Sequence, residues 1–315
     1  MKLNSGIARE FVERQIRLAL RPADARALAL VRIGIMGGVL FLHLSYRHIE
    51  KWFEPVVLPS WEPTGVGHLL TPWIEHLAHP SVANVLWWMF TLSTVAALIG
   101  LGWRITSMVS LLGSLFFVSV ANGIGHMFRV ELPLIFAQAV LVASHANHAW
   151  SLDSLMRKRT SPLPPVEFAW PIAATQFVLI HMYFLAGLAK VFARGEDLIR
   201  SPLILAREAI YQNAVTRAGI LEGQWYEAAG HWVAQRDWAV GAIGWGTMFF
   251  ELGVVVLWLR LQRRWLFVPI IIFMQMGVYL LLGIEFLLPL FLLISFFAAD
   301  AIRVYDQIIL RLRRP

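Results

Sequence analysis

Long apolar runs, separated by short clusters of basic residues, dominate this chain. Of its 315 residues, 58% are hydrophobic and only 15% are charged, whereas a soluble domain carries about 25% charged residues. An apolar run of about 20 residues is long enough to cross the hydrocarbon core of a bilayer as a helix. We therefore predict an all-α polytopic membrane protein. Its expected architecture is a bundle of about eight transmembrane helices, with an N-terminal interfacial helix and exoplasmic amphipathic helices.

The basic clusters predict the topology, because positively charged residues concentrate on the cytoplasmic side of a membrane. Both termini are then cytoplasmic, and segment 1–26 lies on the cytoplasmic surface of the membrane, which we take to be the cell (inner) membrane. Segments 46–82 and 191–237 are too polar to span and are predicted to be exoplasmic. The predicted spans are 27–45, 83–103, 105–121, 132–146, 166–190, 238–259, 265–282 and 286–302. The whole chain, 1–315, is predicted to be one membrane domain.

Charge and cysteine content exclude several classes of function. The net charge is +7, but the basic residues lie at the margins of the apolar runs, so we expect membrane lipids as partners and no nucleic acid. The chain has no cysteine, which excludes thiolate nucleophiles and cysteine-ligated metals. His145 and His148 have no third ligand at a diagnostic spacing. We therefore predict no metal.

The segment 176–190, QFVLIHMYFLAGLAK, combines an apolar run with a polar face. Residues that share this face of a helix are Gln176, Ile180, Tyr183, Gly187 and Lys190. A lysine held inside a membrane costs a few kcal/mol, and such groups usually face a bundle interior. Burial favours the neutral amine, which can act as a base, and Gly187 admits either a neighbouring helix or a flat ligand. The alternative is that Lys190 reaches the interface as an anchor.

Three further groups have residue types that carry chemistry. Asn147 and His148 lie in ANHAWSLDSL, where the alternative is a structural helix end. His126 lies in the turn between the third and fourth spans, where it could meet the outer end of the Lys190 helix or be solvated. Arg32 and Glu251 are isolated charges within spans, so they could neutralise each other, as a structural ion pair or a catalytic one.

With these residues assembled, the chain resembles the membrane domain of vitamin K-dependent gamma-carboxylase, a family also called the horizontally transferred transmembrane (HTTM) domain. The resemblance runs in order along most of the chain. It is carried by Arg32 in LVRIG, GLGWRITS at 100–107, ANHAWSLDSL at 146–155, YFLAGLAK at 183–190 and Glu251.

The resemblance implies a carbon–carbon lyase. In that family, the lysine that closes the AG-x-x-K motif deprotonates vitamin K hydroquinone. The anion reacts with oxygen to give a stronger base, which removes a gamma proton from a peptide glutamate, and carbon dioxide then adds. By position, Lys190 is the base, and His126 is the implied second catalytic residue. The implied cofactor-binding residues are Tyr183, Gly187, Arg32, Asn147, His148 and Glu251. A vitamin K-type hydroquinone is then the cofactor, oxygen and carbon dioxide are co-substrates, and an exoplasmic peptide is the substrate.

This chain also departs from the family pattern. The family usually follows its lysine with tryptophan and glycine, where this chain has ARGEDLIRSP at 193–202, and Phe273 or a neighbour replaces a histidine of the seventh span. The alternative function is a non-enzymatic accessory or maturation factor for a secreted peptide. A transporter is disfavoured because the sequence shows no internal repeat.

Overall fold

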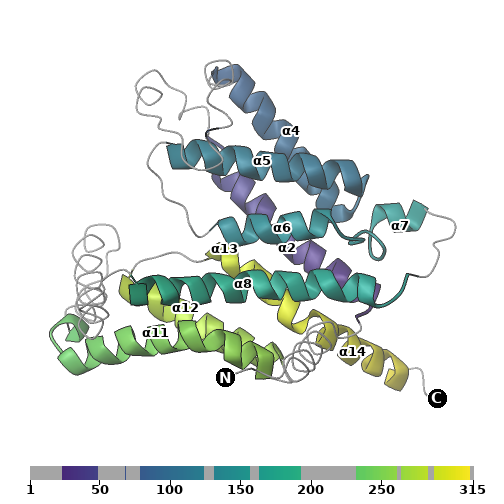
Figure 1. The fold of residues 1–315 in the computed structure, drawn as a ribbon. Coiled ribbons are helices and arrows are strands. Elements are labelled where there is room, and N and C mark those ends of the chain that lie inside the picture. Colours follow the sequence, from purple (N-terminus) through teal and green to yellow (C-terminus); the bar gives the residue numbers. More distant parts are fainter. Residues whose placement is uncertain are drawn as a thin grey trace, which may run out of the picture. The chain divides into compact units, whose positions relative to one another are not determined.

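All regular elements in the described part of the chain are helices, which confirms the predicted all-α class (Figure 1). The computed structural model describes residues 23–48, 68, 79–123, 131–156, 163–192, 232–260, 264–282 and 287–312. Contacts group the chain into two compact units: unit 1 is Met1–Val178 with Leu288–Pro315, and unit 2 is Leu179–Leu287. Most residues of the predicted surface segments 1–26, 46–82 and 191–237 lie outside the described ranges.

Within the described ranges, six helical stretches are long and apolar enough to cross a membrane, so the protein is a multi-pass membrane protein. The long helices are α2 (Ala25–Ser45), α4 (Pro80–Ile99), α5 (Trp103–Gly123), α8 (Val166–Phe192), α11 (Asp237–Arg260) and the run α13 (Leu287–Leu290), η6 (Phe291–Leu293) and α14 (Ile294–Leu312). Two shorter apolar helices, α6 (Leu132–Val142) and α12 (Phe267–Leu282), occupy the predicted fourth and seventh spans. The predicted count of about eight therefore corresponds to six helices of spanning length and two shorter ones.

Helix α2 is the central helix of unit 1. It packs against α4, α5, α6, η6 and α14, and 61% of its apolar window is buried, compared with 33% for α4. Gly34 and Gly38 lie one turn apart where α2 meets the last helices. A Cβ on Gly34 would lie 2.7 Å from Ile294 Cδ1, and one on Gly38 would lie 2.7 Å from Phe291 Cγ. Small residues let membrane helices approach closely, so these glycines determine the packing of the first helix on the last.

Polar side chains from four helices form a hydrogen-bonded network inside unit 1. His43 of α2 contacts Thr94 of α4 through Nδ1 and Ser114 of α5 through Nε2, each at 3.0 Å. Thr94 Oγ1 lies 2.6 Å from Ser110 Oγ, which accepts a 2.9 Å bond from Gln138 Nε2 of α6. All five side chains are fully buried. Hydrogen bonds between membrane helices contribute about 0.6 kcal/mol each, so the network holds the four helices together.

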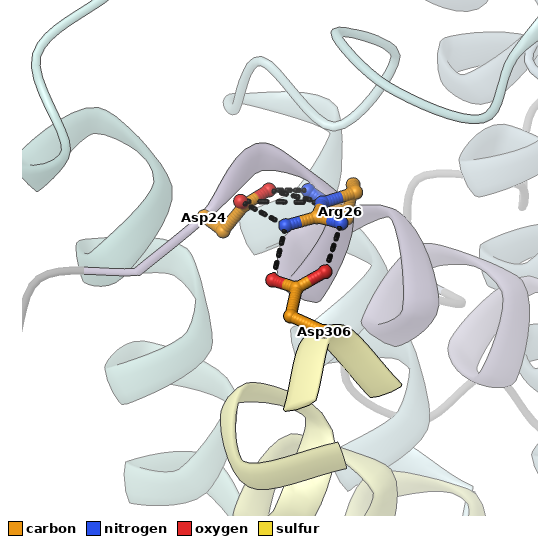
Figure 2. A network of polar contacts seen from close by, with 3 residues as sticks. All are labelled: Asp24, Arg26 and Asp306. Atoms are coloured by element: carbon orange, nitrogen blue, oxygen red, sulfur yellow. Dashed lines mark hydrogen bonds and ion pairs between the residues drawn. The ribbon is translucent and has the colours of Figure 1, made fainter. Parts of the chain in front are cut away.

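An ion pair joins the first and last described helices of unit 1. Asp24 is the N-cap of α2, and its carboxylate accepts a 2.7 Å bond from the backbone N–H of Arg26. Figure 2 shows the Arg26 guanidinium between two carboxylates: it contacts both oxygens of Asp306 on α14 at 2.8 Å and also Asp24. These side chains are partly exposed, so solvent screens the two pairs and their contribution to stability is small. Their bidentate geometry orients α14 against the start of α2.

Candidate functional site

The predicted site residues within the described ranges fall into two clusters, one in each unit. In unit 1, Arg32 is fully buried on α2. Its Nη1 donates to Ala146 O at 2.8 Å and to Ala149 O at 3.3 Å, and its Nη2 donates to Trp150 O. All described hydrogen bonds of Arg32 thus go to backbone carbonyls of the turn that follows α6. The guanidinium thus supplies hydrogen-bond donors to backbone carbonyls that lie outside a helix and lack helical donors.

Asp153 binds the other side of the same turn. Its Oδ1 accepts from Gly102 N at 2.9 Å, and its Oδ2 accepts from Trp103 N at 3.1 Å and from Asn147 Nδ2 at 2.9 Å. Trp103 begins α5, so Asp153 caps this helix from a distant part of the chain. Asp153 N donates in return to Gly100 O at 3.1 Å. We call the assembly of Arg32, Asp153, Asn147 and the turn at 100–103 the Arg32 clamp.

Three of the motifs that carried the family resemblance therefore meet in the Arg32 clamp. LVRIG supplies the arginine, GLGWRITS supplies the turn between α4 and α5, and ANHAWSLDSL supplies the carbonyls and Asp153. Arg32 and Asn147 are engaged by protein groups, so their assignment to cofactor binding remains a prediction without support from their contacts. His148 packs on Phe168, with ring centroids 5.5 Å apart.

The second cluster lies in unit 2, where α8, α11 and α12 supply one side chain each. Tyr183 of α8, Glu251 of α11 and Gln275 of α12 are all at least 95% buried. Gln275 Nε2 donates to the Tyr183 hydroxyl oxygen, and the ring of Phe250 packs edge-on against Tyr183 at 6.0 Å. Gln275 Oε1 is buried and has no hydrogen-bond partner among the described residues. We call Tyr183, Glu251 and Gln275, together with Gly187, the α8 cluster.

Gly187 places α8 directly against α11. A Cβ at this position would lie 2.9 Å from Glu251 Cβ and 3.2 Å from Leu252 Cδ2. Of the two alternatives for this glycine, a neighbouring helix or a flat ligand, the structure therefore has the helix. Gly187 brings the Glu251 backbone to the same face of α8 that carries Tyr183.

Lys190 follows Gly187 by three residues on α8, which is helical through Phe192. Residues 183, 187 and 190 share one helix face, so the backbone at Lys190 continues the face of the α8 cluster. Its side chain and all of His126 lie outside what the structure describes. Their catalytic roles remain predictions.

Sequence reasoning did not identify Gln275 or the His43 network. Gln275 is the one strongly polar residue in FVPIIIFMQMGVYLLL, the sequence of α12. A polar residue in an apolar run is energetically costly in a membrane. That cost alone could have identified Gln275 as a candidate site residue from the sequence. The departure noted at Phe273 lies two residues away, and Phe273 itself is 82% exposed, so Gln275 is the polar group that α12 turns inward.

These features define a multi-pass α-helical membrane protein that buries polar side chains in both of its compact units. The chain belongs to the HTTM domain family, whose model matches residues 20–300. This match confirms the predicted family. Comparisons with curated proteins and with solved structures found no significant match.

Proposed function

We propose that the protein is a membrane-embedded enzyme similar to gamma-carboxylase, in which Lys190 deprotonates a vitamin K-type hydroquinone. The observation that carries the proposal is the α8 cluster: buried polar side chains from three helices converge on the face of α8 whose backbone continues to Lys190. Polar groups buried in a membrane bundle are costly and usually functional. Family membership supports the proposal as well.

The residues of the α8 cluster fit a ligand that carries hydroxyl groups. Gln275 Oε1 is a buried acceptor without a described donor, and a quinol hydroxyl supplies such a donor. Tyr183 holds the Gln275 amide through its hydroxyl. Bound quinol, with oxygen, would supply the strong base that removes the gamma proton of a glutamyl side chain before carbon dioxide adds.

In this proposal, Lys190 accepts one proton from the quinol hydroxyl through its neutral amine. A base of this kind contributes about 10²–10⁴-fold to a reaction rate. Apolar surroundings that keep water out would strengthen the electrostatic interactions within such a site. Gln275 orients the quinol, and the exoplasmic glutamyl peptide is the acceptor.

Replacing Lys190 by alanine is expected to lower quinol epoxide formation and glutamyl carboxylation by about 10²-fold or more. The assay uses the purified protein in lipid nanodiscs with vitamin K hydroquinone, bicarbonate, oxygen and a glutamyl peptide. Mass spectrometry measures both products. Lys190→Arg is the matched variant, because arginine retains the cation but supplies no neutral amine.

The two variants separate a base from a membrane anchor. If Lys190 is the base, both variants are inactive while the protein still inserts and melts as the wild type does. Full activity in Lys190→Arg would identify an anchor and reject the catalytic role. A wild-type protein that forms neither product, but supports maturation of a secreted peptide, would favour the accessory function.

A further inference from the structure

Tyr46 and Glu131 form a buried pair at the ends of two helices of unit 1. Tyr46 is the C-cap residue of α2, and Glu131 is the N-cap residue of α6. The Tyr46 hydroxyl donates to Glu131 Oε1 at 2.7 Å. The two residues are 5% and 4% exposed, so the pair is shielded from solvent even though it lies at helix ends.

The second oxygen of this carboxyl group has no hydrogen-bond partner in the part of the chain that the structure describes. Glu131 Oε2 is buried without a hydrogen bond among the described residues, and the side chain does not cap α6. No basic side chain in the described ranges forms an ion pair with Glu131. A buried carboxylate with a single hydrogen-bond donor is costly, so the neutral acid is favoured.

Among the described residues, neighbouring titratable groups do not compensate a negative charge on Glu131. Phe117 of α5 packs on Tyr46 and on His43 of α2, with ring centroids at 5.7 and 4.9 Å. Both ring nitrogens of His43 already contact hydroxyl groups of the His43 network. Arg47, which follows Tyr46, is exposed. Tyr46 is therefore the titratable group in the described ranges that acts on Glu131.

We infer that Glu131, held by Tyr46, is a proton-exchange site of unit 1, a carboxyl group that takes up and releases a proton under physiological conditions. On release, the O–H bond of the Glu131 carboxyl breaks and the proton passes to a solvent base. Tyr46 keeps its own proton and donates it to the carboxylate as a hydrogen bond. This site lies in unit 1 and does not depend on the proposed reaction at Lys190.

The electrostatics of the pair agree with this role. Burial raises the pKa of Glu131 to about 7, while the hydrogen bond from Tyr46 acts in the opposite direction. Burial and the neighbouring carboxyl group raise the pKa of Tyr46 above its ordinary value, so the phenol stays protonated. The proton that exchanges is therefore the carboxyl proton.

Infrared difference spectroscopy of the full chain in nanodiscs tests the site directly. Between about pH 5 and about pH 9, which brackets neutrality, the wild type is expected to lose a carboxylic-acid C=O band with a midpoint near neutral pH. Glu131→Gln removes the band, and Tyr46→Phe moves its midpoint to higher pH because the carboxylate loses its donor. Glu167→Gln, at the start of α8, is the matched control and retains the band.

Carboxyl-labelled glutamate keeps the test decisive if Glu131→Gln does not fold. The band must then shift on labelling in the wild type, and its midpoint must move in Tyr46→Phe. A Glu131 that is ionised throughout the range, or a band that Glu131→Gln and Tyr46→Phe both leave unchanged, overturns the inference. Neither readout requires quinol turnover, so the outcome is independent of the proposed function.

The same group predicts a pH dependence of stability. Because the folded-state pKa of Glu131, about 7, lies above its unfolded value, the folded state binds the proton more tightly. Stability from this group is therefore fully present below the unfolded pKa and is lost as pH rises through about 7. Thermal melts of the wild type should show this loss as a melting temperature that falls with rising pH. The melting temperature of Glu131→Gln should change less over the same pH range. An equal slope in both proteins would contradict the assignment.

Discussion

Replacing Arg32 by leucine is expected to destabilise unit 1 by about 3–5 kcal/mol, the cost of removing one partner from a buried charged network. The guanidinium donates to Ala146 O, Ala149 O and Trp150 O. Leucine leaves these carbonyls without donors, and each buried unsatisfied group costs about 1–3 kcal/mol. Unfolding of the purified protein in mixed micelles, followed by circular dichroism, measures the loss.

Two further variants show whether the hydrogen bonds or the charge matter. Arg32→Lys retains the charge but not the planar fork of donors, so its stability should lie between the wild type and Arg32→Leu. Arg104→Leu is the control, because Arg104 is exposed on α5, and a surface substitution usually changes stability by no more than about 0.5 kcal/mol. If Arg32→Leu melts like Arg104→Leu, the Arg32 clamp does not stabilise the fold.

The positions of the helices could be predicted from the sequence because length and hydrophobicity determine which segments cross a bilayer. The first predicted span, 27–45, matches α2 at Ala25–Ser45, and the predicted span 238–259 matches α11 at Asp237–Arg260. The fourth span was predicted as 132–146, but α6 ends at Val142. Its last residues instead form the turn whose carbonyls Arg32 binds, a contact between residues more than 100 positions apart. Hydropathy carries no information about such contacts.

The partners of the polar residues could not be predicted for the same reason. Arg32 and Glu251 stood out as charges within spans, and pairing them was the simplest way to reduce their cost. Backbone carbonyls of a turn are an equally good partner for a guanidinium, and a sequence does not show which turns approach it. Tyr183, Gly187 and Glu251 were predicted as site residues, and all three lie in the α8 cluster. Gln275 joins them only through the folding of α12 against α8.

Replacing Gly187 by alanine should disrupt the packing of the α8 cluster, although it adds only one methyl group. The added Cβ would lie 2.9 Å from Glu251 Cβ, a side-chain atom next to the α11 backbone, so α8 and α11 must separate. Overpacking of this kind costs about 1–3 kcal/mol, which exceeds the roughly 0.5–1 kcal/mol that alanine gains over glycine within a helix. We expect lower thermal stability and, if the proposed reaction occurs, a larger loss of quinol epoxide formation.

Gly253→Ala is the matched control on α11, since a Cβ there meets no atom within 4 Å. Both changes add one methyl group to a helical glycine, so they share the gain in helix propensity and differ only in what the methyl group contacts. Gly253→Ala should therefore be neutral or stabilising, and activity should be unchanged. Equal melting temperatures for the two variants would show that α8 and α11 do not pack closely at Gly187. The geometric basis for placing Glu251 beside the Lys190 face of α8 would then be lost.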